Sequence, residues 1–216
     1  IRAGITIYAK WLINEYILSQ DWFKRFTSDS TYKEKIATIQ FINTTTTEKD
    51  SSWQGKIHVG KTENDLIYLS RRTSSTNSSL YDFLIWSDGT IMAPPSSGWL
   101  FGSSSSFGNY KELISISFEN FNTSKATTMR SMFSRCGYTK MTSLNLGDKF
   151  DTSDVTDMKR MFVACGYRAM TSLDLGDKFD TSNVIDMGYM FYFCGIRAMT
   201  SLDLGDKFDT SNVTDM

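Results

Sequence analysis

The chain has 216 residues, of which 40% are hydrophobic and 14% aromatic, and its formal net charge is −1. This composition can supply a core for one or two domains. The charge argues against a protein that binds nucleic acid or an anionic membrane, since such proteins normally carry a basic stripe. No apolar run approaches the roughly 18 residues of a membrane-spanning helix.

The N-terminal part predicts mainly β-structure. Residues 1–11 alternate apolar and polar side chains as a strand does, and residues 12–26 predict a short helix. Segments rich in β-branched and aromatic residues predict four further strands, at 35–42, 56–59, 65–69 and 81–86. The turn Ser87-Asp88-Gly89 predicts a hairpin between the last of these strands and residues 90–92.

A 29-residue unit repeats in the C-terminal half. Its copies occupy 121–149, 150–178 and 179–207, and the last two copies differ at only seven positions. A fixed period of this size predicts a solenoid, in which each repeat stacks its apolar face on the next. A fourth copy begins at Phe208 and has nine residues, so we expect the sequence to be part of a longer chain.

The repeats divide the chain into three predicted units. Residues 98–120 match the repeat loosely, so we expect the solenoid to extend over 98–216 with an atypical first repeat. Residues 12–97 would form a mostly β cap, because an uncovered first repeat would expose strand edge and core. Residues 1–11 would be the last strand of a preceding module.

Each repeat predicts one strand and one short helix, which makes the fold class an α/β solenoid. Met158, Met161, Phe162 and Cys165 have the spacing of one helix face, with Asp157 placed as its N-cap. The following Thr-Ser-Leu-x-Leu segment alternates like a half-buried strand. Phenylalanines at the start of each repeat would fill the interior, at Phe150, Phe179 and Phe208.

The motif F-D-T-S-N-V-T-D-M-x-x-M-F-x-x-C followed by L-D-L resembles the BspA-like leucine-rich repeats of bacterial surface proteins and lipoproteins. The resemblance covers 121–216, although the usual family repeat is shorter than 29 residues. It implies an extracellular, right-handed solenoid used for adhesion or recognition, without shared catalytic residues. The ending T-I-Y-A-K-W at 6–11 is similar to the last strand of internalin B-type β-grasp repeats.

The sequence offers no constellation for catalysis, so we expect a protein that is not an enzyme and needs no cofactor. Cys136, Cys165 and Cys194 recur one repeat apart and are best interpreted as buried packing residues, with a disulfide or a zinc site as less favoured alternatives. His58 is the only histidine, and a structural role is favoured for it. Recurrent aspartates could hold Ca²⁺, but lysines beside them offer a simpler compensation of charge.

We look for candidate binding residues at the positions where the repeats differ, because core packing and turn formation explain the residues that the repeats share. Tyr189, Tyr192 and Phe193 would collect aromatic surface on one repeat, and such patches often mark interaction sites. Variable positions in the preceding repeat complete the candidate set, at Lys159, Arg160 and Tyr167.

Two classes of function follow from these patterns. The first is an extracellular recognition or adhesion module of a cell-surface protein, which would bind a protein or glycan on another cell or host surface. The second is a structural stalk, or a unit that assembles with further copies of itself in a surface layer or filament. Neither class requires nucleic acid or insertion of this chain into a membrane.

Overall fold

The computed structural model describes residues 15–19, 22, 30–43, 52–103 and 110–216, and its regular elements are almost all short β-strands. The predicted strand at 1–11 lies outside these residues. The described elements are β1 (Glu15–Ile17), the 3₁₀ helix η1 (Ser30–Lys35), β2 (Ile36–Asn43), β3 (Gln54–His58), β4 (Tyr68–Thr73), β5 (Tyr81–Ser87), β6 (Thr90–Met92), β7 (Ser115–Ser117), β8 (Phe121–Asn122), β9 (Ser143–Asn145) and β10 (Ser172–Asp174).

A five-stranded sheet with the order β3-β4-β5-β2-β7 forms the N-terminal part. Three of the four predicted strands are confirmed nearly in place, whereas the strand predicted at 65–69 lies at Tyr68–Thr73. The predicted hairpin is wrong, because β6 pairs with β1 and β8 in a separate sheet rather than with β5. The helix predicted at 12–26 is wrong in part, since Glu15–Ile17 is a strand beside β6.

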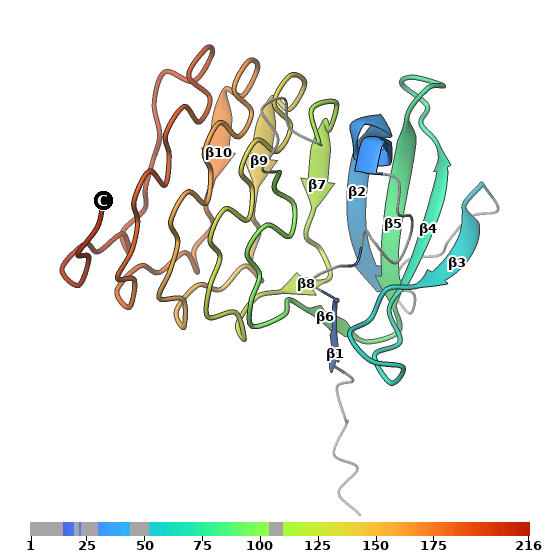
Figure 1. Ribbon diagram of the computed structural model, residues 1–216, viewed down its shortest axis with the longest axis horizontal. Coiled ribbons are helices and arrows are strands. Elements are labelled where there is room, and N and C mark those ends of the chain that lie inside the picture. Colours follow the sequence, from blue (N-terminus) through green and yellow to red (C-terminus); the bar gives the residue numbers. More distant parts are fainter. Residues whose placement is uncertain (1–14, 20–21, 23–29, 44–51, 104–109) are drawn as a thin grey trace, which may run out of the picture.

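The N-terminal sheet is joined directly to the repeats. β2 pairs in parallel with β7, where Ile39 lies opposite Ile116. β9 and β10 also pair in parallel, with Leu144 opposite Leu173, so each strand is one repeat from its partner. In Figure 1 the strands from β10 to β3 follow one another along the longest dimension of the molecule. One continuous apolar core extends beneath them, from Leu18 to Met190.

The predicted helices are absent, and residues 110–216 contain no α-helix. The segment 158–165 is a series of tight turns. The N–H groups of Met158 and Arg160 donate to the next repeat, to Asp186 O and Gly188 O at 2.9 Å, while Met161 N–H donates back to Met158 O at 3.0 Å. Along this segment, every second N–H group therefore donates to a carbonyl of the next repeat, and the others donate within the same repeat. In an α-helix, all of these N–H groups would donate to carbonyls of the same helix.

The apolar spacing that predicted a helix is nevertheless a core pattern. Met158, Met161, Phe162 and Cys165 are all fully buried. Phe162 lies between Phe133 and Phe191, with ring centroids 5.4 and 5.5 Å away and planes within 3° of parallel. Phe101 continues this column, with its ring centroid 5.5 Å from that of Phe133 and the planes 18° apart.

Besides the stacked phenylalanines, buried threonines also connect successive repeats. Thr152 Oγ1 donates to Asp180 O at 2.8 Å and accepts from Asp180 N–H at 2.7 Å. Thr181 makes the same pair of hydrogen bonds with Asp209 one repeat further on. Both threonines are fully buried, so each hydroxyl pairs backbone groups that would otherwise lack partners.

The part of the chain that the structure describes contains no helix with the length and hydrophobicity of a membrane span.

Candidate binding surface

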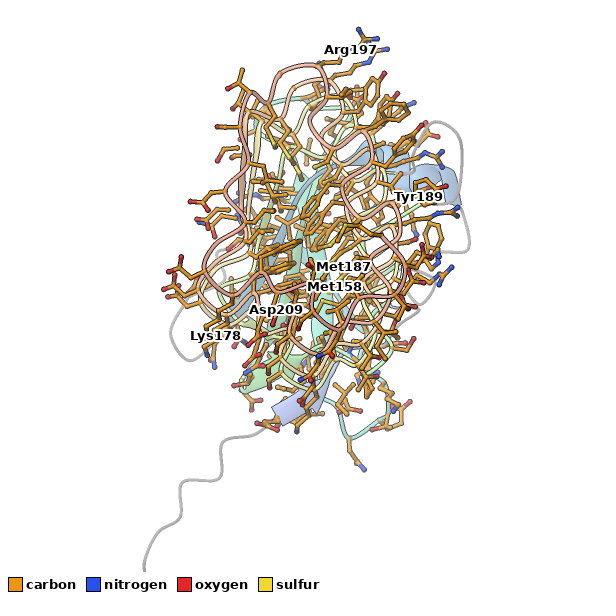
Figure 2. The ribbon with its side chains drawn as sticks, turned by 90° about the vertical axis from the view of Figure 1, so that its left-hand side faces the viewer. Met158, Lys178, Met187, Tyr189, Arg197 and Asp209 are labelled. Atoms are coloured by element: carbon orange, nitrogen blue, oxygen red, sulfur yellow. The ribbon has the colours of Figure 1, made fainter. Side chains whose placement is uncertain are left out.

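A groove crosses four successive repeats on one side of the stack. Its volume is about 560 Å³. Among the described residues, seven line it: Trp99, Ser134, Arg135, Arg160, Val163, Tyr189 and Tyr192. Trp99, Tyr189 and Tyr192 are 43%, 57% and 50% exposed, so the groove presents three large aromatic side chains to solvent. Figure 2 places Tyr189 on the opposite side of the molecule from Lys178.

Four of the seven lining residues have a left-handed backbone. The φ angles of Trp99, Arg135, Arg160 and Tyr189 lie between 58° and 62°. Residues with a Cβ atom pay for this conformation, typically about 1 kcal/mol or more, and glycine would occupy it without that cost. The same conformation occurs at Ser131, Ala164 and Phe193, so it is a property of these turns in each repeat and not of the groove alone.

Two arginines lie between the aromatic ends of the groove. The Arg160 guanidinium lies 5.6 Å from the centre of the Tyr189 ring, a distance that permits a cation–π interaction. Tyr189 meets Tyr192 edge to face at 5.7 Å. Arg135 and Arg160 are the two charged residues of the lining, and none of the seven is acidic. The groove is therefore a positively charged surface flanked by aromatic rings.

The structure brings four of the six predicted residues together. Tyr189, Tyr192 and Arg160 line the groove, and Phe193 lies beside it against Tyr192, with 4.0 Å between ring centroids. Tyr167 does not line the groove but meets Phe193 edge to face at 6.0 Å. Its ring also stacks on Tyr138 at 4.8 Å, and the Arg197 guanidinium lies 5.7 Å from its centre.

Lys159, the sixth predicted residue, belongs to a ladder of ion pairs. Its Nζ lies 3.1 Å from Asp186 and 2.5 Å from Asp215, and Arg130 lies 3.4 Å from Asp157 in the same ladder. Burial alone would raise the pKa of Asp186, but the Gly188 N–H, Lys159 and Arg130 together hold this pKa below its usual value. The lysine thus neutralises aspartates of the two following repeats.

These aspartates do not cap helices as predicted. Asp157 accepts the N–H of Lys159 at 2.9 Å, and Asp186 accepts that of Gly188 at 2.9 Å. Each carboxylate therefore closes a local turn two residues long. The sequence identified the correct acceptors, and their partners are turn amides because no helix follows.

Sequence reasoning missed Trp99, Ser134 and Arg135. Trp99 N–H donates to Arg130 O as Ser131 N–H donates to Lys159 O, so Trp99 is the counterpart of Ser131, Arg160 and Tyr189. This equivalence is hidden in the sequence because the first repeat differs in length from the others. Aligning Phe101 with Phe133 is the one signal that could have revealed it.

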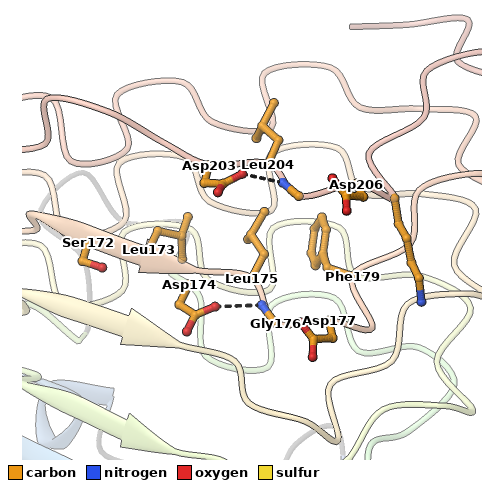
Figure 3. Close-up of a pocket in the computed structure, with 12 residues that line it drawn as sticks. Ser172, Leu173, Asp174, Leu175, Gly176, Asp177, Phe179, Asp203, Leu204 and Asp206 are labelled. Carbon is orange, nitrogen blue, oxygen red and sulfur yellow. Dashed lines mark hydrogen bonds between the residues drawn. The ribbon is translucent and has the colours of Figure 1, made fainter.

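A second hollow lies among the turns of the last repeats and is rich in aspartate (Figure 3). Asp174 and Asp203 line it, and their side chains accept the N–H groups of Gly176 and Gly205 at 3.0 and 2.9 Å. These carboxylates therefore shape turns. Within the described residues, no group of three or more histidine, cysteine or acidic side chains is arranged to hold a metal ion.

The three cysteines are free thiols in one column. A hydrogen bond with Cys136, together with burial, raises the pKa of Cys165. Burial likewise raises the pKa of Cys194, which lies near Cys165. Neutral, buried thiols behave as small apolar side chains. His58 Nε2 donates a hydrogen bond of 2.7 Å to the Asp65 carbonyl, and its ring packs edge to face on Tyr68.

Comparison with known proteins places the repeat region in a family. Residues 102–216 match the family described as Mycoplasma protein of unknown function, DUF285. The chain belongs to this family, and the match includes six of the seven groove residues. No curated protein and no solved structure matches the chain.

Proposed function

We propose that the chain is a non-catalytic recognition module of an extracellular, cell-surface protein, and that it binds a protein or glycan through the groove. The observation that carries this proposal is the exposure of Trp99, Tyr189 and Tyr192 in one groove that also contains two arginines. Tryptophan, tyrosine and arginine are the residue types that contribute most to binding interfaces.

We further propose that the repeats form a leucine-rich-repeat-like solenoid of the BspA-like kind. Parallel pairing of β9 with β10 and the column of phenylalanines one repeat apart support this assignment. In such an architecture the groove would run along the stacking direction, where substitutions between repeats vary the surface without disturbing the core.

A structural role in self-assembly is the alternative. Ile185 and Ile196 are 51% and 55% exposed, so the same repeat also carries apolar surface outside the groove lining. In a stalk or surface layer, further copies of the chain would cover such residues.

One pair of variants separates these functions. We would label the wild-type protein, a Tyr189→Ala/Tyr192→Ala variant and an Ile185→Ala/Ile196→Ala variant, and measure their binding to a panel of intact animal cells. The recognition function predicts at least about tenfold weaker binding for the tyrosine variant, since hot-spot aromatic residues commonly contribute more than 1 kcal/mol each. The isoleucine variant serves as the control, because it removes equally exposed apolar surface from the same repeat.

The alternative predicts a different result. If the chain is an assembly unit, sedimentation would show self-association that the isoleucine variant loses, and the tyrosine variant would bind cells as the wild type does. Equal cell binding by all three proteins would contradict the recognition function of the groove.

A further inference from the structure

We propose that the ligand of the groove is an acidic polysaccharide, a linear glycan chain whose sugars carry carboxylate groups. This inference rests on the proposed recognition function and specifies its ligand class. Guanidinium groups bind carboxylates with paired, charge-assisted hydrogen bonds. Aromatic rings with a polar end, such as those of tyrosine and tryptophan, suit ligands that present both apolar and hydroxylated surfaces.

The charges of the lining favour an anion. Arg135 and Arg160 line the groove, and none of the seven lining residues is a carboxylate. Two neighbouring cations outside the lining, Arg130 and Lys159, lie against Asp157, Asp186 and Asp215. On this side of the molecule, the groove therefore combines arginines with aromatic rings, whereas the neighbouring surface combines cations with aspartates.

The shape of the groove favours an extended chain. Its lining comes from four successive repeats, beginning with Trp99 and ending with Tyr189 and Tyr192. Between these ends lie Arg135 and Arg160, one from each intermediate repeat. A ligand that contacts both arginines and both aromatic ends must therefore lie along the stacking direction and carry more than one anionic group.

The backbone of the groove favours a glycan over an extended peptide. Peptides that bind as added strands need unpaired backbone N–H and C=O groups. Here the N–H groups of six of the seven lining residues already donate within the chain. Arg135 and Arg160 donate to Val163 and Gly188 in the following repeats, and Ser134, Val163 and Tyr192 close turns, while Trp99 donates to Arg130. Recognition is left to side chains, which suits a ligand without an amide backbone.

The test compares three polymers by isothermal titration calorimetry on the whole chain. Hyaluronate supplies a carboxylated glycan, its methyl ester supplies the same polymer without charge, and poly-L-glutamate supplies an acidic peptide. We expect hyaluronate to bind, and the methyl ester and poly-L-glutamate to bind at least about tenfold more weakly. Added salt should weaken the binding of hyaluronate because exposed charges are screened.

Matched variants locate the binding site. Arg135→Ala/Arg160→Ala should weaken hyaluronate binding at least about a hundredfold, which corresponds to about 1.4 kcal/mol for each tenfold step. Alanine retains the Cβ atom at both left-handed positions, so the backbone strain stays the same. The control, Lys178→Ala/Lys207→Ala, removes the same charge from exposed side chains that do not line the groove and should bind normally.

Each other outcome overturns the inference in a distinct way. Equal binding of the methyl ester would remove the role of charge, and equal, arginine-dependent binding of poly-L-glutamate would identify an acidic protein as the ligand. No binding of hyaluronate, together with cell binding that depends on Tyr189 and survives hyaluronidase treatment, would refute the glycan and leave the recognition function intact. Loss of tyrosine dependence on cells would refute the recognition function itself.

Discussion

The phenyl rings of Phe133 and Phe162 lie face to face, with centroids 5.4 Å apart and planes within 3° of parallel. Both rings are fully buried and come from equivalent positions of neighbouring repeats. Phe162 also stacks on Phe191, so its removal would open a cavity between three repeats.

Phe162→Ala should therefore lower the free energy of unfolding by about 3–5 kcal/mol, as truncation of a buried phenylalanine usually does. Urea denaturation followed by circular dichroism measures this change. Phe193→Ala is the control, since Phe193 is 45% exposed, and it should cost less than about 1 kcal/mol. Similar losses for both variants would show that the column does not determine stability.

Thr152→Val removes a buried hydroxyl while keeping the shape of the side chain. The hydroxyl serves both the N–H and the C=O of Asp180, so the variant leaves two backbone groups without their partner. We expect a loss of about 1–3 kcal/mol in unfolding free energy. Thr156→Val is the matched control, because Thr156 is exposed and its hydroxyl makes only a long hydrogen bond of 3.4 Å. A neutral Thr152→Val variant would contradict this role.

Ala164→Gly tests the strain in the turns. Ala164 has a φ of 51°, which glycine adopts without the steric cost that alanine pays. The relief of strain, about 1–2 kcal/mol, exceeds the entropic cost of glycine, about 0.5–1 kcal/mol, so the variant should be more stable by up to about 1 kcal/mol. Ala169→Gly makes the same chemical change without a positive φ and should destabilise the protein. Thermal unfolding of both variants decides the sign.

Asp186 predicts a specific response to acid. Its pKa in the folded protein lies below the usual 3.8, so its carboxylate stabilises the fold above about pH 4 and loses this effect as the pH falls through the lowered pKa. Asp186→Asn keeps an acceptor for the Gly188 N–H but removes the charge that faces Lys159. Its unfolding free energy should fall less steeply below about pH 4 than that of the wild type. Parallel pH curves for Asp186→Asn and the wild type would exclude the effect.

The repeat period and the buried side chains could be predicted from the sequence, because each repeat must bury the same apolar face. Leu144 and Leu173 lie in the expected strands, and Phe150 is buried as expected. The helix prediction failed for a physical reason: spacings of three and four residues place side chains on one side of a turn series as well as of a helix. Which of the two forms depends on where alternate N–H groups find acceptors, and those acceptors belong to the next repeat.

The groove was only partly predictable for a related reason. Variation between repeats identified Tyr189, Tyr192 and Arg160, because those side chains interrupt an otherwise constant pattern. Trp99 and Arg135 come from repeats whose sequences differ more, so variation alone did not distinguish them. Their left-handed φ angles are properties of the folded backbone, and neither residue type signals them in the sequence.

The division of backbone N–H groups between turns and neighbouring repeats has an evolutionary consequence. Each repeat offers its neighbour the same row of carbonyl groups that it receives, so one 29-residue unit can follow any other without a new interface. Recombination between nearly identical gene segments can then lengthen or shorten the stack in whole units while the fold persists. Each added unit would also bring another set of variable surface positions, equivalent to Arg160 and Tyr189, at which new binding side chains can arise.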